Sequence, residues 1–275
     1  MGAWDAWVGR SEARDDQLTP ALLTRFRAMI DSDDTSDIAP QGIHFCLCTP
    51  NAATGDLDRD GHPRRGGLMP PVPLPRRMWA SSSIDFLSPI LAGAAITRQS
   101  TVADIKEKTG ASGALVFVTL DHLIHADGVA VVREEQTIVY RAASTDAPAP
   151  RPPDQPIDRS DWPWHRELIP GPPLLFRYSA LTFNTHRIHY DLPYAIEEER
   201  YRGLVVHGPL IATLLLNLVT CEIGPNQLRH FAFRGAAPAF AGEPLHLVGR
   251  QSGDTITLAG LGGDSRLIMT ADARL

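Results

Sequence analysis

Val206-His207-Gly208-Pro209 opens the stretch that decides the fold, and the ten residues after it, Leu210 to Val219, read LIATLLLNLV. This run is apolar on nearly every side, which predicts a helix buried all round rather than an amphipathic surface helix. Proline suits the first turn of a helix, because its missing N–H would have no partner there and its φ is already helical. The sequence therefore predicts a buried central helix that begins at Gly208 and Pro209.

Gly208 at the head of this helix has no side chain, so a ligand can approach its backbone N–H closely. The first N–H groups of a helix lack intrahelical partners and lie at the positive end of the helix dipole, which favours a negatively charged oxygen. The simpler interpretation is a glycine selected only for the turn into a core helix. The histidines nearby in the sequence favour the anion-binding interpretation.

Polar residues concentrate just before the helix, in the segment FNTHRIHYD from Phe183 to Asp191. Histidine is the side chain best suited to take up and return protons near neutral pH. A zinc site is the alternative, since His186, His189 and His207 offer three ligands. The segment has neither the spacing nor the glutamate of the helical zinc-protease motif, so we expect proton transfer and no metal.

Composition narrows the function classes. The chain has 275 residues, 43% of them hydrophobic, and a net charge of −6, which argues against a nucleic-acid-binding surface. No apolar run reaches the ~18–20 residues of a membrane span. The first residues, MGAWDAWVGR, lack the apolar core of a secretory signal. Three cysteines form no disulfide framework, so we expect a reducing, cytoplasmic location.

A weak internal repeat indicates duplication. The segments from Ile84 to Gly93 and from Phe231 to Gly242 both read as a strand followed by a turn with proline and glycine. The prolines are offset by 238 − 89 = 149 residues, and the glycines by 242 − 93 = 149. Other runs rich in β-branched residues are expected as strands, with separate strands over 129–135 and 137–141. A helix is expected over Pro20 to Ile30, with Thr19 as its N-cap.

We therefore expect two modules, residues 1–145 and 161–275, joined by an exposed linker over 146–160 that is dense in Ala, Pro and Asp. The first module has no run comparable to Leu210–Val219, so its central helix is expected to be degenerate. That loss would leave room for a bulky acyl chain or cofactor tail. The irregular stretch from Thr49 to Pro75 is unusually long for a loop, which suggests either a functional role or partial disorder.

The segments FRYSALTFNTHRIHYDLPYA (176–195) and GLVVHGPLIATLLL (203–216) resemble the second half of the MaoC-like double-hotdog hydratases. They are most similar to the branch with itaconyl-CoA and mesaconyl-C4-CoA hydratases and the mitochondrial-type 3-hydroxyacyl-thioester dehydratases. GHPRRGGLMPPVPLPRRMWA (61–80), GALVFVTLDHLI (113–124) and EEQTIVYR (134–141) are similar to the first module of that branch. The resemblance covers residues 4 to 275 and implies an α+β double hotdog, in which each module wraps a curved antiparallel sheet on a central helix.

The chain departs from the motif Asp-x-Asn-Pro-x-His of these hydratases, whose Asp and His hold the attacking water. In an alignment on His189, Asn184 takes the place of Asp, His186 that of Asn and Arg187 that of Pro. Asparagine cannot act as a base, because its amide has only donors and a carbonyl acceptor. The resembling branch shares this change, which leaves the division of labour between the two motif positions open.

The resemblance implies reversible hydration of an enoyl-CoA, with itaconyl-CoA or mesaconyl-C4-CoA giving citramalyl-CoA. We expect Gly208 to stabilise the enolate oxygen, His189 to activate water and return a proton to Cα, and Asn184 to orient the water. His186 and Asp191 are further candidates for proton transfer, although Asp191 alternatively anchors its loop through an Asx turn. CoA is part of the substrate, no other cofactor is expected, and the chain is expected to form a homodimer.

Substrate contacts are expected from several further residues. Arg187 could clamp a substrate carboxylate or form a structural ion pair. Arg76 and Arg77 suit the CoA phosphates, and Trp79 either stacks on adenine or belongs to the core. His207 lies beside Gly208 and is expected to contact the substrate. Three other functions stay open: a dehydratase of fatty acid synthesis, a hotdog thioesterase that releases free CoA, and a non-catalytic acyl-thioester binder.

Overall fold

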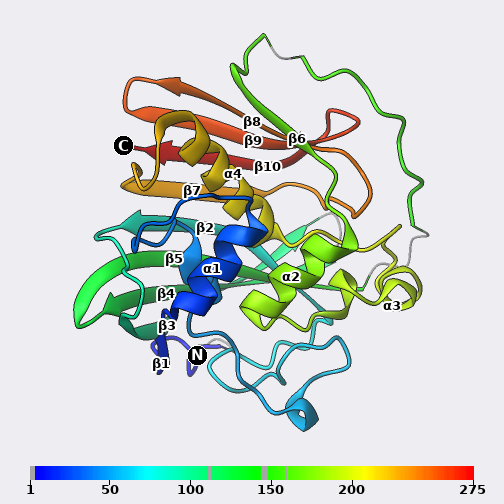
Figure 1. Cartoon of the computed structure of the whole chain (residues 1–275). Coiled ribbons are helices and arrows are strands. Elements are labelled where there is room, and N and C mark those ends of the chain that lie inside the picture. Colours follow the sequence, from blue (N-terminus) through cyan, green and yellow to red (C-terminus); the bar gives the residue numbers. More distant parts are fainter. Residues whose placement is uncertain (1–3, 111–112, 144–147, 159) are drawn as a thin grey trace.

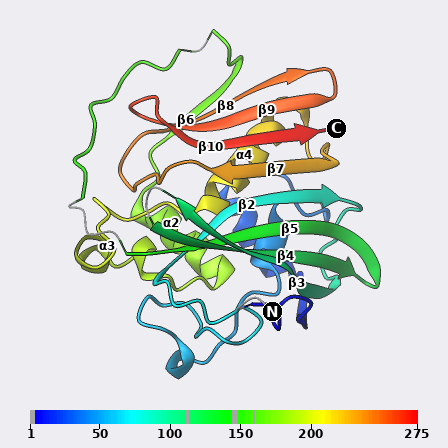
Figure 2. The ribbon, with the colours of Figure 1, turned by 180° about the vertical axis from the view of Figure 1, so that it is seen from behind.

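The computed structural model describes residues 4–110, 113–143, 148–158 and 160–275, and its strands form one ten-stranded antiparallel sheet. Helices lie on one face of the sheet, and the view from behind exposes the strands (Figures 1 and 2). The strand order is β1-β3-β4-β5-β2-β7-β10-β9-β8-β6, so each half of the chain forms one half of the sheet. This arrangement is the α+β double hotdog that the sequence predicts.

The strands of the first half are β1 (Ser11–Gln17), β2 (Arg76–Phe86), β3 (Ala95–Gly110), β4 (Gly113–Ala126) and β5 (Val129–Arg141). Those of the second half are β6 (Trp164–Leu168), β7 (His230–Gly235), β8 (Leu245–Ser252), β9 (Thr255–Gly262) and β10 (Leu267–Arg274). The expectation of separate strands over 129–135 and 137–141 is wrong. Gln136 pairs with Ser82 of β2 and Leu120 of β4, and these partners on both sides keep the backbone of β5 extended.

The two halves meet where β2 pairs with β7, with Ile84 opposite Phe231. The repeat predicted from prolines and glycines has the same backbone hydrogen bonds in both halves. Gly93 donates to the carbonyl of Leu18 at 2.7 Å, and Gly242 donates to the carbonyl of Pro170 at 2.8 Å. Both glycines have a positive φ, of 87° and 80°, which a glycine adopts without strain. The repeat is therefore a structural duplication.

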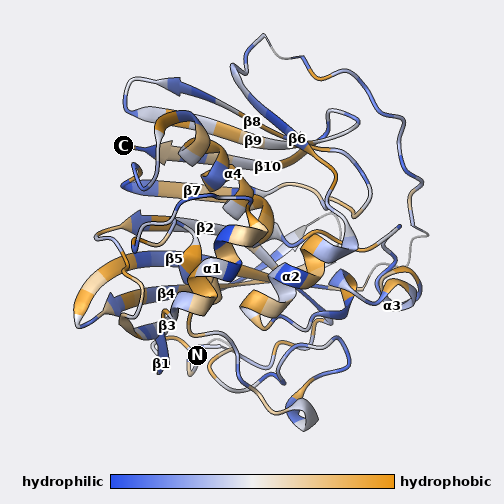
Figure 3. Cartoon of the chain, viewed as in Figure 1, coloured by the Kyte–Doolittle hydropathy of each residue, from blue (hydrophilic) through white to orange (hydrophobic). Residues whose placement is uncertain are grey.

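The predicted central helix is α4 (Gly208–Ile223), and every residue from Leu210 to Val219 is buried. It is one of the most hydrophobic elements of the chain and lies against the second half of the sheet (Figure 3). The other helices are α1 (Pro20–Met29), α2 (Pro172–Thr182) and α3 (Leu192–Glu197). The hydroxyl of Thr19 accepts the N–H of Leu22 at 3.1 Å, so this residue caps α1 as expected.

A second pair of equivalent hydrogen bonds locates the counterpart of α4 in the first half. The N–H of Val206, just before α4, donates to Ala239 at 2.9 Å, and the N–H of Ala39 donates to Ile90 at 2.8 Å. The segment after Ala39 forms only the short 3₁₀ turn η1 (Ile43–Cys46). The described residues thus place one short turn where the second half has a long buried helix.

The connection between the halves has no regular structure over 148–158, and residues 146, 147 and 159 of the predicted linker, with 144 and 145 just before it, lie outside the described ranges. The N–H of Gln155 donates to the carbonyl of Gly263 at 2.7 Å, which attaches the end of the connection to the second half. Strand β5 ends at Arg141 and β6 begins at Trp164, so the expected module boundaries fall between them. Within the described ranges, no helix is long and apolar enough to cross a membrane.

Candidate active site

One cavity of about 750 Å³ is built by both halves of the chain. The second half contributes the head of α4 and the loop that follows α2, whereas the first half contributes β2, β5 and the 49–75 segment. Among the predicted site residues, those that line the cavity are Asn184, His186, His189, His207, Gly208, Arg77 and Trp79. The cavity therefore gathers the residues predicted to act in catalysis except Asp191, which was a further candidate for proton transfer.

Gly208 is the first residue of α4, and a Cβ placed on it would meet no atom within 4 Å. Gly208 lines the cavity, and the space beside its Cα is open. Because the first N–H groups of a helix have no intrahelical acceptor, this donor is available to a ligand oxygen at the positive end of the helix dipole. The geometry supports a site for a developing negative charge.

The tautomer of His189 follows from its hydrogen bond. Nδ1 lies 2.7 Å from the carbonyl oxygen of Val205, so Nδ1 carries the proton and Nε2 keeps a free lone pair. The short 3₁₀ turn η3 (Arg187–His189) places the ring flat against His207, with centroids 3.5 Å apart. Burial lowers the pKa of His189 to about 4, so its Nε2 is a neutral base at neutral pH.

His207 and Asn184 hold the local structure as well as lining the cavity. The Nε2 atom of His207 lies 2.8 Å from the Ser179 hydroxyl of α2, and burial lowers the pKa of His207 well below its usual range. The side-chain oxygen of Asn184 accepts the backbone N–H of His186 at 3.0 Å. Asn184 thus stabilises its own loop, and its amide NH₂ remains as a donor.

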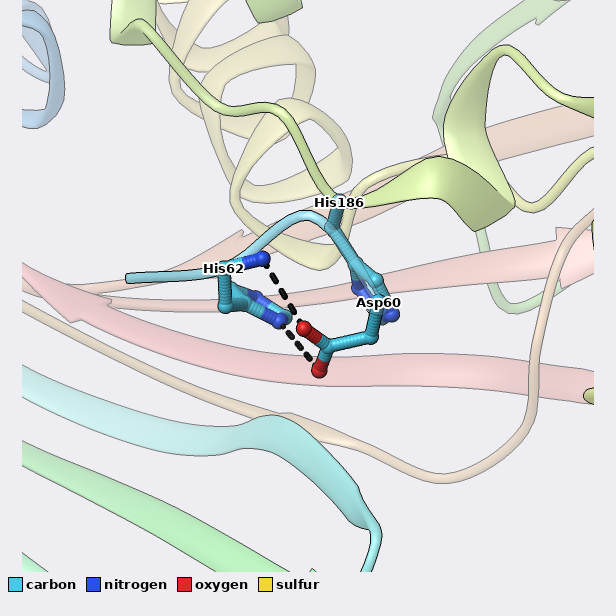
Figure 4. Close-up of side chains that lie close together, drawn as sticks. All are labelled: Asp60, His62 and His186. Atoms are coloured by element: carbon cyan, nitrogen blue, oxygen red, sulfur yellow. Dashed lines mark hydrogen bonds and ion pairs between the residues drawn. The ribbon is translucent and has the colours of Figure 1, made fainter. Parts of the chain in front are cut away.

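Two residues of the 49–75 segment that the sequence did not single out, Asp60 and His62, lie beside His186 (Figure 4). His62 lines the cavity, and its Nδ1 lies 2.9 Å from a carboxylate oxygen of Asp60. The ring of His62 lies against that of His186, with centroids 4.1 Å apart. A turn signal was present, since Asp58 and Gly61 occupy the first and fourth positions that these residue types favour. This turn signal does not predict that the turn contacts the loop of His186.

The histidines of the cluster are held neutral. Burial lowers the pKa of His186, and the neighbouring His62 and His189 lower it further. Burial also lowers the pKa of His62, against the opposing effect of Asp60. Burial would raise the pKa of Asp60, but its hydrogen bonds from His62 outweigh this and hold the pKa below its ordinary value. Asp60 is therefore an ionised carboxylate beside neutral imidazoles.

Asp60, His62 and His186 are also the one group among the described residues whose ligand atoms, all within 4.8 Å of one another, could hold a metal ion. The Nδ1–H of His62 donates directly to the Asp60 carboxylate, so these two groups already satisfy each other. The trio of His186, His189 and His207 considered from the sequence does not form such a group in the described ranges. Hydrogen bonding accounts for the cluster better than coordination does.

Arg187 and Asp191 form an ion pair with each other, with Nη2 and Oδ2 2.7 Å apart, and neither lines the cavity. Asp191 also caps α3 by accepting the N–H of Tyr194 at 3.2 Å, and the Arg187 guanidinium lies over the ring of Tyr194. The structure therefore brings these two predicted residues together as anchors of the loop. This geometry agrees with the ion-pair and loop-anchor alternatives.

Three further residues were predicted to contact the substrate, and two of them, Arg77 and Trp79, line the cavity. Arg76 is buried in an ion pair with Glu199, at 2.9 Å, and lies outside the cavity wall. Arg77 lines the cavity, and its charge contributes to the lowered pKa of both His62 and His186. Trp79 is part of the wall, and its indole N–H donates to Ser82 at 2.8 Å.

A second polar cluster lines the first-half side of the cavity. The hydroxyl of Ser82 donates to Glu134 at 2.6 Å, and the other carboxylate oxygen of Glu134 lies 3.8 Å from His44. Burial raises the pKa of Glu134 to about 7 and lowers that of His44 to about 3. No pattern in the sequence signalled this cluster, because its members are far apart along the chain.

Comparison with known proteins defines the class. The model of the family described as hydroxyacyl-thioester dehydratase type 2 matches residues 42–241. The chain belongs to this family of MaoC-like hotdog dehydratases and is a hydro-lyase that acts on an acyl thioester. The resemblance noted in the sequence is confirmed.

Individual relatives are consistent with this class. A mesaconyl-C(4)-CoA hydratase from Chloroflexus aurantiacus is 40% identical over 280 residues, covering 99% of this chain and 98% of the relative. The crystal structure of a MaoC-like dehydratase from Phytophthora capsici superimposes with a TM-score of 0.70 at 13% identity, covering 97% and 95% of the two chains. A Mycobacterium tuberculosis protein with a double hotdog fold gives a TM-score of 0.57 at 14% identity, covering 97% and 96%. At such low identities the two structures support the fold alone.

Proposed function

We propose that the chain hydrates a C5 dicarboxylic enoyl-CoA, with mesaconyl-C4-CoA as the first candidate substrate and citramalyl-CoA as the product. The observation that carries the proposal is the 40% identity to a mesaconyl-C(4)-CoA hydratase over 99% of the chain, because it extends over both halves that build the cavity. Itaconyl-CoA is the second candidate. Its double bond is not conjugated with the thioester, so water cannot add to it through a thioester enolate.

The proposed mechanism follows the charge. Water adds its oxygen to Cβ, the electrons of the double bond move towards the thioester, and negative charge collects on the thioester oxygen. The N–H of Gly208 at the head of α4 stabilises that oxygen. Loss of one such donor typically raises a barrier by roughly 3–4 kcal/mol. Protonation of Cα by the proton that water has lost completes the product.

His189 is proposed to hold and polarise the attacking water, because its Nε2 has a free lone pair and its ring is fixed by Val205 and His207. Asn184 lines the same cavity and presents its amide NH₂, which can donate to the water oxygen. Positioned acid–base groups of this kind are usually worth about 10²–10⁴-fold in rate.

The substrate carboxylate is proposed to bind Arg77. In mesaconyl-C4-CoA this carboxylate is attached to Cβ, the carbon that water attacks, so its partner should lie near the histidines. Arg77 lines the cavity and its charge acts on His62 and His186, whereas Arg187 is held by Asp191 outside the wall. Arg64, which is exposed and lines the cavity, is suited to a CoA phosphate.

The test is to incubate the protein with mesaconyl-C4-CoA, itaconyl-CoA and crotonyl-CoA, and to follow enoyl-thioester absorbance together with free thiol. We expect the mesaconyl absorbance to disappear without thiol release, with a higher kcat/KM than for crotonyl-CoA. Thiol release would identify a thioesterase, and no turnover of any ester would favour a binder. The family description favours one further candidate, dehydration of a fatty 3-hydroxyacyl thioester, and preference for crotonyl-CoA would support it.

A further inference from the structure

The turn that carries Asp60 and His62 is attached to the motif loop of the other half by its backbone. The N–H of Arg187 donates to the carbonyl of Asp60 at 2.9 Å, and the Thr185 hydroxyl donates to the carbonyl of Gly61. The guanidinium of Arg187 also donates to the carbonyl of Arg59 at 3.1 Å. Three hydrogen bonds thus fix successive residues of this turn beside the segment that contains His186 and His189.

Within the turn, Asp60 determines the tautomer and orientation of His62. One carboxylate oxygen accepts the backbone N–H of His62 at 2.9 Å, and the other accepts its Nδ1–H at 2.9 Å. Because Nδ1 carries the proton, Nε2 has a free lone pair. The Asp60 side chain is only 13% exposed, so its charge is poorly screened by water. This is the arrangement in which a carboxylate stabilises the imidazolium that forms when histidine takes up a proton.

His189 lacks such support, and His186 feels the charge of Asp60 without a direct hydrogen bond or salt bridge to it. Nδ1 of His189 donates to a neutral backbone carbonyl, and no salt bridge between described residues includes either histidine. A proton placed on His189 would create a buried cation without a counter-ion, which is costly. Of the three neighbouring histidines, His62, His186 and His189, His62 is the one within the described ranges whose ring is hydrogen-bonded to a carboxylate.

We propose that His62 is a catalytic acid–base residue of the hydration reaction, that Asp60 is its positioning residue, and that this pair replaces the motif carboxylate lost at Asn184. The inference rests on the hydratase function proposed above. In the hydratase motif a carboxylate and an imidazole hold the attacking water together. Here the second imidazole supplies the missing acceptor, and the ionised carboxylate lies one hydrogen bond behind it.

The proton balance is complete with these groups. One O–H bond of the water breaks as the C–O bond forms at Cβ, and its proton passes to Nε2 of His62, where Asp60 balances the charge. The other O–H bond stays intact, hydrogen-bonded to Nε2 of His189, and becomes the product hydroxyl. The Nε2–H of His62 then protonates Cα as the enolate collapses, which returns His62 to its neutral form. Dehydration runs through the same steps in reverse.

The test compares His62→Ala, Asp60→Asn and the double variant with the wild type, using whichever of the three enoyl-CoA esters the wild type hydrates. We expect His62→Ala to lower kcat by about 10²–10⁴-fold with little change in KM. Asp60→Asn should also lower kcat, and the double variant should be no slower than His62→Ala, because residues that act as a unit are not additive. Asp58→Asn is the matched control, an exposed carboxylate in the same turn that should leave kcat unchanged.

The pH profile separates catalysis from a structural role. The charged and titratable groups that act on His62 or are influenced by it are Asp60, Arg65, Arg77, His186 and His189. Nε2 of His62 must be unprotonated to accept the water proton, so kcat/KM falls as pH falls through the pKa of His62. Asp60 opposes the lowering of that pKa, so Asp60→Asn should move the acid limb to lower pH, and Asp58→Asn should not move it.

Three kinetic results would overturn the proposal: a kcat for His62→Ala within about tenfold of the Asp58→Asn control, additive losses in the double variant, or an acid limb that Asp60→Asn leaves in place. A bound transition metal in the purified protein, with activity abolished by EDTA and restored by zinc, would overturn it in favour of a metal site. Circular dichroism checks that the variants are folded. If His62→Ala does not fold, Asp60→Asn still tests the proposal, because it preserves the shape of the side chain. If the wild type hydrates crotonyl-CoA alone, the proposed dicarboxylic substrate is refuted. The test of His62 and Asp60 still decides their role, because the variants are then compared on crotonyl-CoA.

Discussion

Gly61 of the first half lies so close to the backbone carbonyl of Thr185 in the second half that no side chain fits between them. The φ of Gly61 is +89°, a conformation that other residues adopt only with strain. This contact lets the Asp60–His62 turn reach the motif loop. The proposed acid–base pair therefore depends on one glycine in a segment that otherwise has little regular structure.

Gly61→Ala should displace the turn and lower kcat by about the same factor as His62→Ala, roughly 10²–10⁴-fold. The cause is both the contact with Thr185 and the strained φ, which together cost on the order of 1–3 kcal/mol. Hydrogen–deuterium exchange should become faster over residues 57–63. Gly55→Ala is the control, because a Cβ there meets no atom and φ is not positive. Equal activity of the two variants would contradict the proposed role of the turn.

Gly208→Ala should separate activity from stability. A Cβ on Gly208 meets no atom within 4 Å, and alanine is a better helix former than glycine, so Tm should equal or exceed that of the wild type. The new methyl group would lie beside the N–H that is proposed to stabilise the enolate oxygen, so kcat should fall by at least about tenfold. Thermal unfolding and steady-state kinetics check the two halves of this prediction. A variant with wild-type kcat would show that the N–H of Gly208 is not the oxyanion donor.

Arg77→Gln should raise KM for mesaconyl-C4-CoA far more than KM for crotonyl-CoA, which has no carboxylate. A charge-assisted hydrogen bond of this type contributes about 1.5–3 kcal/mol, or roughly 10–150-fold in affinity. Arg187→Gln is the matched comparison, because Arg187 is held by Asp191 outside the cavity and should affect Tm without changing substrate preference. If Arg187→Gln removes the preference for mesaconyl-C4-CoA over crotonyl-CoA and Arg77→Gln does not, the substrate carboxylate binds Arg187 and not Arg77.

Glu134 should make stability depend on pH. Burial raises its pKa from an ordinary value of 4.5 to about 7, so the folded protein holds this proton more tightly than the unfolded chain does. That stabilising contribution is complete below the unfolded pKa and is lost as pH rises through about 7. Glu134→Gln should therefore raise Tm relative to the wild type at pH 8 and change it little at pH 5. Glu135→Gln, at an exposed neighbouring position, should show no such difference; the same difference there would mean that burial of Glu134 is not the cause.

Local signals in the sequence predicted a large part of this molecule. The apolar run Leu210–Val219 with Pro209 before it could only be a buried helix, and Thr19 before Pro20 marks a capped helix start. The duplication was visible because proline and glycine occupy the same turns in both halves. Arg187 and Asp191 are four residues apart, so their ion pair was also within reach of the sequence.

The partners of the motif histidines were not predictable in this way. Asp60 and His62 are more than 120 residues from His186 in the chain, and the backbone hydrogen bonds that hold them there involve no side-chain pattern in the 49–75 segment. The same reason hides the Glu134–His44 cluster, which forms only when β5 and η1 come together. Gln136 interrupts the β-branched run of β5 with a polar residue typical of a turn, but pairing on both sides keeps the strand continuous.

The most direct test of the central claim is mass spectrometry of mesaconyl-C4-CoA incubated with the wild type and with His189→Ala in ¹⁸O-labelled water. The wild type should form an intact CoA thioester that has gained one labelled water, with the label in the hydroxyl on Cβ. The His189→Ala variant should form this product at least about 10²-fold more slowly. Labelled free acid with released CoA, or an equal rate of labelling by His189→Ala, would contradict this claim.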